Sequence, residues 1–357
     1  MRNDSRILFN QFAAQVAKLN GVPDATQKFA VEPSVQQRLE KRIQESSDFL
    51  RRINIIGVDE LKGEKLALGV SGPIAARTDV SKQERDTRDL SSLDTQSYEC
   101  RITEFDTHLG YNKIDAWAKF PNFQAMIRDT IVRQQALDRI TIGFNGTRAA
   151  VQSDPVVNPL LQDVNIGWLQ HYRDQAPERV MAKGKAGGNV VIDPTPTKGE
   201  DGKINGMVGD YATLDVLVYD AISSFIQPWY RRNPGLVVIL GRNLMDDKYF
   251  PLLNQLAPSE QLAADLVISQ KRIGGLRGLD VPFFPDNALM VTTLDNLSIY
   301  WQNGARRRYV TENPKRNRIE NYESSNEAYV VEDFGAGCLV ENIEMSPAAL
   351  RGDGGKQ

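Results

Sequence analysis

The sequence predicts an α+β fold, because its helices and strands do not alternate in the regular order of parallel βαβ units. The longest helical pattern, over residues 121–143, lies in the middle of the chain and is followed by further helices. Strand patterns instead gather after Gly278, and they cover 289–293, 297–301, 306–310, 328–331 and 338–343. The length of 357 residues allows about two domains.

Residues 121–143 have the clearest helical pattern of the chain. Their apolar positions recur at three- and four-residue steps, which predicts one buried face. These positions are Phe123, Met126, Ile127, Thr130, Ile131, Gln134, Leu137 and Thr141. Gln135 and Arg139 fall outside this face, and Gly143 with Asn145-Gly146 supplies a stop signal for the helix. A helix of this length would be a rod of roughly 34 Å. It could form the core of an ordinary domain or the backbone of an extended one.

Residues 1–29 predict a separate amphipathic helix that ends at Asn20-Gly21. Its apolar face consists of Leu8, Phe9, Phe12, Val16 and Leu19. The segment carries a net charge of +2, so the rest of the chain carries −5 of the total of −3. Such a helix packs on its own core, lies on a membrane or binds a partner helix. Two excess basic charges make the membrane alternative unattractive.

The next part of the chain predicts an extended hinge, a helix and a strand. Residues 29–34 form the hinge, since Pro33 disfavours helix at the residue before it. The helix is expected over 34–52, and the strand over 53–58. These elements lead directly into a longer and more charged stretch.

Residues 62–109 predict a long hairpin with strands at 66–70 and 102–109. Between the strands, residues 77–96 are dense in charge and poor in apolar side chains, so they cannot build a core. Such a stretch is typical of a disordered surface loop or of an arm that becomes ordered against a neighbouring subunit.

The remaining pattern between the long helix and the C-terminal strands is mostly helical. Helices are expected over 159–181, 211–230, 242–253 and 259–268, with a buried strand over 236–240. Val164, Trp168 and Tyr172 would face inward from the first of these helices. The Gly- and Lys-rich residues 183–207 predict a mobile insertion, and 351–357 a frayed tail.

No convincing active site follows from the residue pattern, so the chain is not expected to be an enzyme. His108 and His171 have no neighbouring ligand residues, and Cys100 and Cys338 match no metal or redox spacing. We therefore expect no cofactor and no metal, and we expect both thiols to be small packed residues. The alternative is an α+β nucleotide-binding enzyme that uses the turn Gly235–Gly241, although this turn has one glycine where the fingerprint has three.

Two basic clusters, Arg306–Arg308 and Lys315–Arg318, admit three interpretations. They form a solvated strand surface, a phosphate-binding patch, or complementary contacts between copies of the chain. Acidic residues such as Glu312, Glu320 and Glu323 are interleaved with them. This pattern favours contacts between copies, and the nucleic-acid alternative predicts a steep salt dependence of DNA affinity.

Long stretches of the sequence resemble the major capsid protein of Peduovirus-type temperate, contractile-tailed phages. The stretches are KFAVEPSVQQRLEKRIQESSDFLRRINI (28–55), GEKLALGVSG (63–72), NPLLQDVNIGWLQHYRDQAPERVM (158–181), LVVILGRNLMDDKYFPLLN (236–254), AADLVISQKRIGGL (263–276) and NPKRNRIENYESSNEAYVVEDFGAGCLVENI (313–343). The stretches come in family order, and the similarity around them extends over nearly the whole chain. The resemblance implies the tailed-phage capsid fold of the Hong Kong 97 type.

The resemblance also implies a division of the chain. It assigns 1–29 to an N-terminal segment removed on maturation, 30–61 to an N-arm, 62–110 to an extended β-hairpin loop, 111–209 to a peripheral domain with the spine helix 121–143, 210–318 to an axial domain, 319–346 to the return to the peripheral domain, and 347–357 to a flexible tail. The maturation junction would lie at Phe29-Ala30.

The family implies a structural role with several partners. These are copies of the chain itself in hexamers and pentamers, an internal scaffold that carries the protease, a portal protein at one vertex, and double-stranded DNA held by weak non-specific contact, with no membrane. The protein would belong to the virion capsid, assembled in the bacterial host cytoplasm. Some relatives of this fold join lysine to asparagine covalently; Lys82 and Asn326 are the candidates here, but the resembled group implies no such bond.

Overall fold

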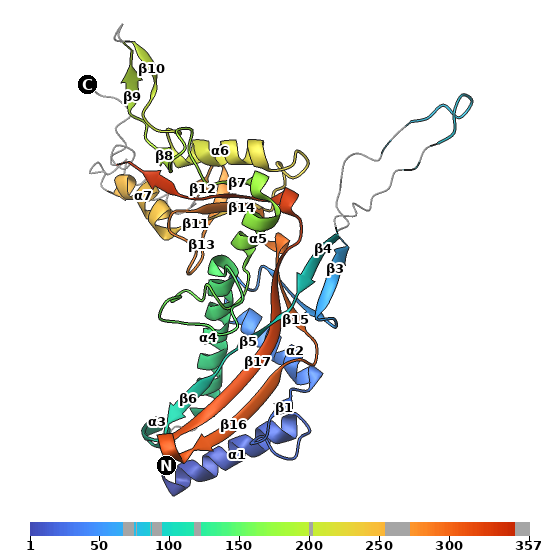
Figure 1. Ribbon diagram of the computed structural model, residues 1–357, viewed down its shortest axis with the longest axis vertical. Helices are drawn as coiled ribbons and strands as arrows, with labels where there is room; N and C mark the ends of the chain where they lie inside the picture. Colours follow the sequence, from blue (N-terminus) through green and yellow to red (C-terminus); the bar gives the residue numbers. More distant parts are fainter. Residues whose placement is uncertain are drawn as a thin grey trace. The chain divides into compact units, whose positions relative to one another are not determined.

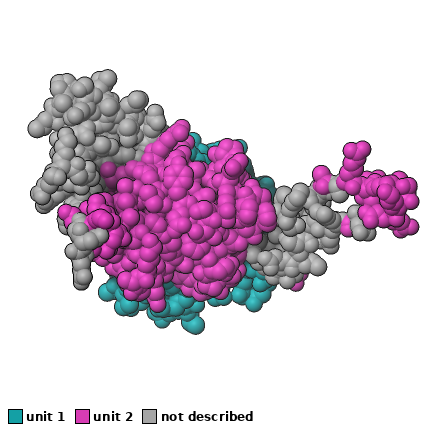
Figure 2. All heavy atoms as spheres, turned by 90° about the horizontal axis from the view of Figure 1, so that it is seen from above, with its two compact units in different colours: residues 1–63, 97–167, 298–330 teal, residues 64–96, 168–297, 331–357 magenta. Residues whose placement is uncertain are grey.

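The computed structural model describes residues 1–66, 75, 77–85, 87, 95–117, 123–199, 203–253 and 272–346. The predicted mixture of helices and strands is confirmed (Figure 1). The chain forms two compact units (Figure 2): the first comprises 1–63, 97–167 and 298–330, and the second 64–96, 168–297 and 331–357. The seven-part division implied by the resemblance, from 1–29 to 347–357, stays a prediction. None of the described helices is long and apolar enough to cross a membrane.

The first unit is built on a seven-stranded sheet with the order β1-β16-β17-β15-β2, in which β5 and β6 also pair with β17. Its strands are β1 (Phe29–Ala30), β2 (Asn54–Val58), β5 (Arg101–Glu104), β6 (Thr107–Gly110), β15 (Leu297–Gln302), β16 (Arg307–Asn313) and β17 (Arg318–Val331). The 14-residue β17 is the longest of these strands. Between β16 and β17, Asn317 adopts the left-handed conformation, which asparagine tolerates better than most residues.

The described residues of the first unit include the helices α1 (Asn3–Leu19), α2 (Pro33–Glu45), α3 (Tyr111–Trp117) and α4 (Phe123–Asn145). Helix α2 begins at Pro33, whose fixed φ suits the first helical position. The Glu32 side chain accepts a hydrogen bond from the Val35 N–H at 3.1 Å and caps the helix. The helix is shorter than the predicted 34–52.

The long helix α4 is confirmed, but its predicted buried face is partly wrong. It ends at Asn145, two residues after the predicted range and within the predicted stop signal. Gln135 and Arg139, which the periodicity placed outside the apolar face, are buried, whereas Thr130 and Gln134 are exposed. Gln135 and Arg139 are buried because they pair with buried charged side chains of other elements. The apolar pattern of the helix does not reveal these partners.

The predicted hairpin over 62–109 has a different return strand. Its paired strands are β3 (Lys62–Leu66) and β4 (Thr95–Glu99). Residues 102–109 instead form β5 and β6, which pair with β17 because that strand is long enough to hold both. Of the predicted strand 66–70, Leu66 ends β3 and residues 67–70 lie outside the described residues, as do residues 86 and 88–94 of the charged stretch 77–96.

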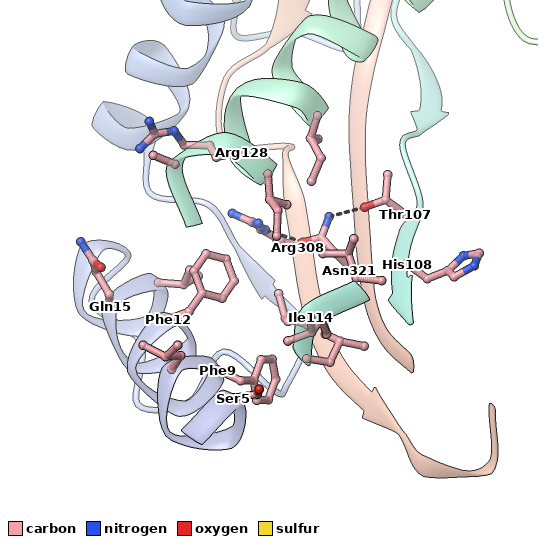
Figure 3. Close-up of a pocket in the computed structure, with 18 of the residues that line it drawn as sticks. Ser5, Phe9, Phe12, Gln15, Thr107, His108, Ile114, Arg128, Arg308 and Asn321 are labelled. Carbon is pink, nitrogen blue, oxygen red and sulfur yellow. Dashed lines mark hydrogen bonds between the residues drawn. The ribbon is translucent and has the colours of Figure 1, made fainter. Parts of the chain in front are cut away.

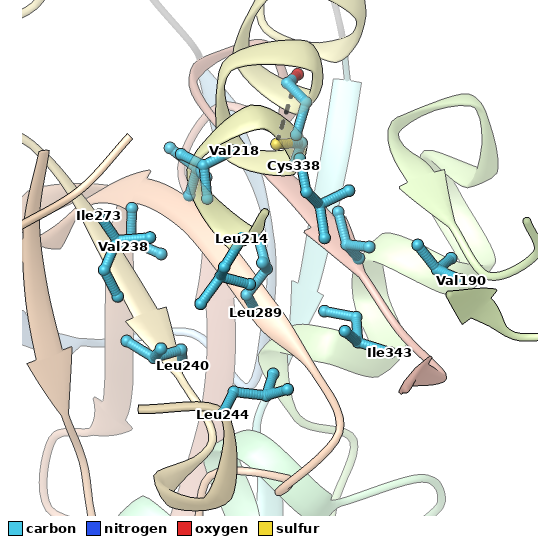
Figure 4. Packing of buried hydrophobic residues seen from close by; sticks show 14 of the residues in the cluster. Val190, Leu214, Val218, Val238, Leu240, Leu244, Ile273, Leu289, Cys338 and Ile343 are labelled. Carbon is cyan, nitrogen blue, oxygen red and sulfur yellow. Dashed lines mark hydrogen bonds between the residues drawn. The ribbon is translucent and has the colours of Figure 1, made fainter. Parts of the chain in front are cut away.

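The second unit contains a six-stranded sheet with the order β12-β13-β11-β14-β18-β7. Its strands are β7 (Val180–Met181), β11 (Leu236–Leu240), β12 (Arg272–Ile273), β13 (Leu276–Asp280), β14 (Leu289–Thr293) and β18 (Cys338–Val340). Helix α6 (Leu214–Phe225) supplies buried side chains, among them Leu217 and Val218, to the core that includes Val238 and Leu289 (Figure 4). The apolar run predicted over 236–240 is therefore a buried central strand.

Some predicted elements of the second unit are shorter than expected. The helix predicted over 159–181 is reduced to α5 (Trp168–Gln175), and the helix predicted over 211–230 is reduced to α6. The insertion 183–207 contains β8 (Val190–Ile192), β9 (Pro196–Lys198) and β10 (Ile204–Met207); β8 pairs with β19 (Ile343–Met345). Helix α7 (Arg242–Leu253) is confirmed, while 259–268 and 351–357 lie outside the described residues.

Candidate functional site

The candidate site is the N-terminal segment, residues 1–31, together with the surface of the first unit that it covers. The end of this segment runs antiparallel to the edge strand β16, with Phe29 opposite Arg308. The Val31 N–H donates to the Arg306 carbonyl oxygen at 2.8 Å, and the Val310 N–H donates to the Ala25 carbonyl oxygen at 3.2 Å. The segment therefore satisfies backbone groups that an open sheet edge would expose.

The junction Phe29-Ala30, predicted as part of an extended hinge, forms strand β1 of this edge. Phe29 is buried, whereas Ala30 is exposed. Phe29 belongs to a small apolar cluster with Val16, Ala17, Ala25 and Val31. The backbone is extended as expected, but pairing and burial hold it in place.

Polar contacts fasten the first turns of α1. The Arg6 guanidinium donates two hydrogen bonds to the Glu312 carboxylate, both of 3.0 Å. Glu312 also accepts a hydrogen bond of 2.6 Å from the Tyr111 hydroxyl. The hydrogen bonds from Tyr111 and Arg6 lower the pKa of Glu312. The Arg2 N–H donates to Asp115 at 2.9 Å, so both α3 and β16 hold this end of the helix.

A cavity of about 420 Å³ remains beside α1 (Figure 3). Phe9 and Phe12 of α1 line one side, and Ile114 of α3 and Ile131 of α4 belong to the remaining lining. His108 also lines it, and the described residues contain no group of side chains that could hold a metal ion. The N-terminal segment thus covers a largely apolar surface without filling it.

Elsewhere in the first unit, five charged side chains form a buried network that joins α2, α4, β17 and the residue before β16. Arg139 contacts Glu40 at 2.7 Å and Glu327 at 2.5 Å. Arg306 contacts Glu40 at 2.6 Å and Glu323 at 2.7 Å. All five side chains are almost completely buried. One carboxylate, Glu40, therefore links α2 to both guanidinium groups.

Gln135 completes the network from the neighbouring turn of α4. Its side-chain oxygen accepts a hydrogen bond of 3.0 Å from Arg306, and its side-chain nitrogen donates to Glu323 at 3.1 Å. These partners explain why a glutamine lies in the protein interior, since buried polar groups are stable only when hydrogen-bonded.

The preferred interpretation of the basic clusters as contacts between copies is wrong for Arg306. This residue is buried and paired within its own chain. Arg308 donates to Asn321 at 2.8 Å, and Arg318 pairs with Glu320 at 2.7 Å. These contacts leave Arg307, Lys315 and Arg316 as the exposed cations of the two clusters, which is too few for a strong phosphate-binding patch.

The acidic partners of the network predict a loss of stability in acid. Burial alone would raise the pKa of Glu40 and of Glu323, but the nearby guanidinium groups outweigh burial and lower both pKa values. Their contribution to the free energy of unfolding is present above the unfolded pKa of about 4.3 and is lost as the pH falls through the folded values. Urea unfolding at a series of pH values should show this decline, and a free energy of unfolding that stayed constant from pH 7 to 3 would contradict it.

The other residues singled out from the sequence have structural explanations. A Cβ on Gly241 would lie 2.2 Å from the Asp286 carbonyl oxygen, so close backbone packing requires glycine there. Cys100 and Cys338 are buried, which confirms their expected packing role. The Gln175 side-chain nitrogen lies 3.0 Å from His171 Nδ1. Asn326 donates to the Gln302 side chain at 2.8 Å, and Lys82 pairs with Asp79 at 3.4 Å.

Comparisons with known proteins show which family this chain resembles. Residues 8–343 match the family model described as phage major capsid protein, P2 family. The chain is 50% identical to the "Capsid proteins" of Escherichia phage P2, covering 97% of this chain and 96% of the relative. It is 40% identical to the "Major capsid protein" of Serratia phage KSP20, covering 97% of this chain and 98% of the relative.

A solved structure provides the corresponding comparison in three dimensions. A chain of the satellite phage P4 procapsid, solved with its size determination (Sid) protein, superposes with a TM-score of 0.77 at 46% sequence identity. The match covers 98% of this chain and 100% of the procapsid chain. The fold is therefore the tailed-phage capsid fold of the Hong Kong 97 type, and the chain belongs to the P2 family of phage major capsid proteins.

Proposed function

We propose that this chain is the major capsid protein of a phage and that many copies of it form the icosahedral shell around double-stranded DNA. The observation that supports this proposal most directly is the similarity, over nearly the whole chain, to a subunit of a solved procapsid. Its function is geometric rather than catalytic. Many small contacts between copies, repeated by symmetry, would together stabilise the shell.

The proposal includes removal of residues 1–29 at the Phe29-Ala30 junction by a protease associated with an internal scaffold. Helix α1 and the residues after it pack together and pair with β16 through β1, so a cut at the junction would separate them from the rest of the chain. Its loss would change the net charge of the chain from −3 to −5. A more acidic inner surface of the shell would bind packaged DNA less tightly. A portal protein would occupy one vertex of the shell.

Production of the chain together with its scaffold and protease tests this processing step. N-terminal sequencing and intact mass of the resulting particles should identify a new terminus at Ala30. DNA-filled particles whose subunits keep Met1 would contradict the step without affecting the shell-forming role. Tight DNA binding by empty mature shells at moderate salt would contradict the role assigned to the acidic lining.

Weakening the attachment of α1 should expose the junction to a protease. Arg6→Ala removes both hydrogen bonds to Glu312, so the segment should detach more often. Chymotrypsin, which cuts after aromatic residues, should then cleave after Phe29 severalfold faster, because cleavage follows the population of the open form. Arg2→Ala is the matched control, since it keeps the backbone hydrogen bond to Asp115. Equal cleavage rates of the two variants would contradict the assigned role of Arg6.

A further inference from the structure

The cavity of about 420 Å³ beside α1 has an apolar part and a polar corner (Figure 3). Leu109, Val310 and Ile319 line it from three neighbouring strands of the sheet, β6, β16 and β17. Phe9 and Phe12 line it from α1, and both are only half-buried. Apolar surface therefore lies on two sides of the cavity, and covering it with a further apolar group would be favourable.

The polar corner consists of Arg308, Asn321 and Thr107, which come from the same three strands. Arg308 Nε donates to the Asn321 side-chain oxygen at 2.8 Å, and this acceptor is neutral. The Asn321 side-chain nitrogen lies 3.5 Å from the Thr107 hydroxyl oxygen, which is too long for a strong hydrogen bond. All three side chains therefore retain donors for the oxygens of an anion.

The charged groups that line the cavity are all basic. Among the described residues, its lining includes Arg128 and Arg308 but no aspartate or glutamate. Arg128 is paired with Asp129 at 2.9 Å. Glu323 lies opposite Arg308 on β17, but its carboxylate contacts Arg306 at 2.7 Å. A ligand that suits this cavity would carry a negative charge near Arg308, an apolar body and no positive charge.

We propose that this cavity binds a medium-chain alkyl carboxylate, with the carboxylate on Arg308 and the alkyl chain between α1 and the sheet. Arginine binds a carboxylate through two parallel hydrogen bonds. The volume lies in the range of about 300–1,000 Å³ that small-molecule sites occupy. The ligand would contact α1 and the sheet together, so it would hold the N-terminal segment in place. This consequence rests on the proposed function, in which removal of residues 1–29 takes away the α1 side of the cavity.

Titration calorimetry of the full-length chain with hexanoate, heptanoate and octanoate tests the apolar part of the site. Each added CH₂ group should tighten binding about fourfold, equivalent to about 0.8 kcal/mol, because it is buried in the cavity. Octan-1-ol has the same chain length without the charge, and it should bind at least about tenfold more weakly than octanoate. No binding of octanoate, or equal binding of octanoate and octan-1-ol, would overturn the proposal.

Substitution of the arginine tests the polar corner. Arg308→Gln should weaken octanoate binding at least about tenfold, because it removes the positive charge from the cavity. Arg307→Gln is the matched control, since Arg307 is exposed and, as the preceding residue of β16, points to the opposite face of the sheet. Equal octanoate affinities of the two variants would contradict the assigned role of Arg308.

Chymotrypsin cleavage after Phe29 measures whether the ligand holds α1 in place. At an octanoate concentration ten times its Kd, cleavage should be about tenfold slower, because the ligand stabilises the closed form. Arg308→Gln should show no such protection, and this variant also controls for any effect of octanoate on the protease. Unchanged cleavage of the unsubstituted chain at this concentration would overturn the proposal.

A second set of conditions separates the free carboxylate from a membrane lipid of similar chemistry. Phosphatidylglycerol vesicles present alkyl chains and negative charge in a bilayer, and they should not slow cleavage after Phe29. Protection by the vesicles equal to that by octanoate would overturn the free carboxylate as the ligand. Octanoate binding by a chain that keeps residues 1–29 in finished particles would support the site and count against the proposed processing alone.

Discussion

Replacing Arg139 with methionine is expected to lower the free energy of unfolding of the first unit by about 3–5 kcal/mol. The Arg139 side chain is fully buried and contacts the carboxylates of Glu40 and Glu327. Methionine would leave the charge of Glu327 without its arginine partner in the protein interior, and would leave Glu40 with Arg306 alone. Urea unfolding followed by circular dichroism measures the loss.

Arg133→Met is the matched control for this prediction. Arg133 lies on the same helix but is exposed, and surface substitutions of this kind usually change stability by less than about 0.5 kcal/mol. If the two variants unfolded at the same urea concentration, the buried network would have no role in holding α2 and β17 to α4.

Replacing Trp168 with alanine should destabilise the second unit by about 3–5 kcal/mol, through lost apolar burial and the cavity left behind. The Trp168 side chain, at the start of α5, is 0% exposed. Thermal unfolding monitored by calorimetry measures the effect. Trp229→Ala removes an indole of the same unit that is 44% exposed, so it should cost much less. A larger shift for Trp229→Ala than for Trp168→Ala would contradict the assigned core position.

The elements that the sequence predicted well are those whose stability is local or whose burial is uniform. Helix α4 has a long periodic pattern, and β11 and β14 are short apolar runs, so their existence followed from residue order alone. The helix predicted over 159–181 exists only as α5, because the residue pattern did not show that Asp154 and Asp163 hold the preceding residues in a loop. Hydrogen bonds of that kind depend on side-chain geometry rather than on apolar spacing.

The buried network could not be predicted from apolar periodicity. Its members, Glu40, Arg139, Arg306, Glu323 and Glu327, come from distant parts of the chain, and each one read alone is a surface residue. Arg139 had a detectable signal in hindsight, since Ala136, Ile140 and Ile142 around it are apolar and buried. That signal marks a charged residue in a buried stretch but does not identify its partners.

At the candidate site, too, the sequence predicted the local structure of the N-terminal segment but not its long-range contacts. Its helix, its end at Asn20-Gly21 and the extended backbone near Pro33 followed from local rules. The pairing of Phe29 with Arg308 joins residues that are far apart in sequence, so only the folded sheet defines it. The function itself came from the long matching stretches, because no catalytic or metal-binding arrangement in the sequence pointed to chemistry.

The measurement that tests the account most directly is sedimentation of the full-length chain produced with its scaffold, followed by electron microscopy of the fast-sedimenting material. We expect closed shells built of this chain. A chain that remained monomeric in the presence of its scaffold would contradict the shell-forming role on which the account depends.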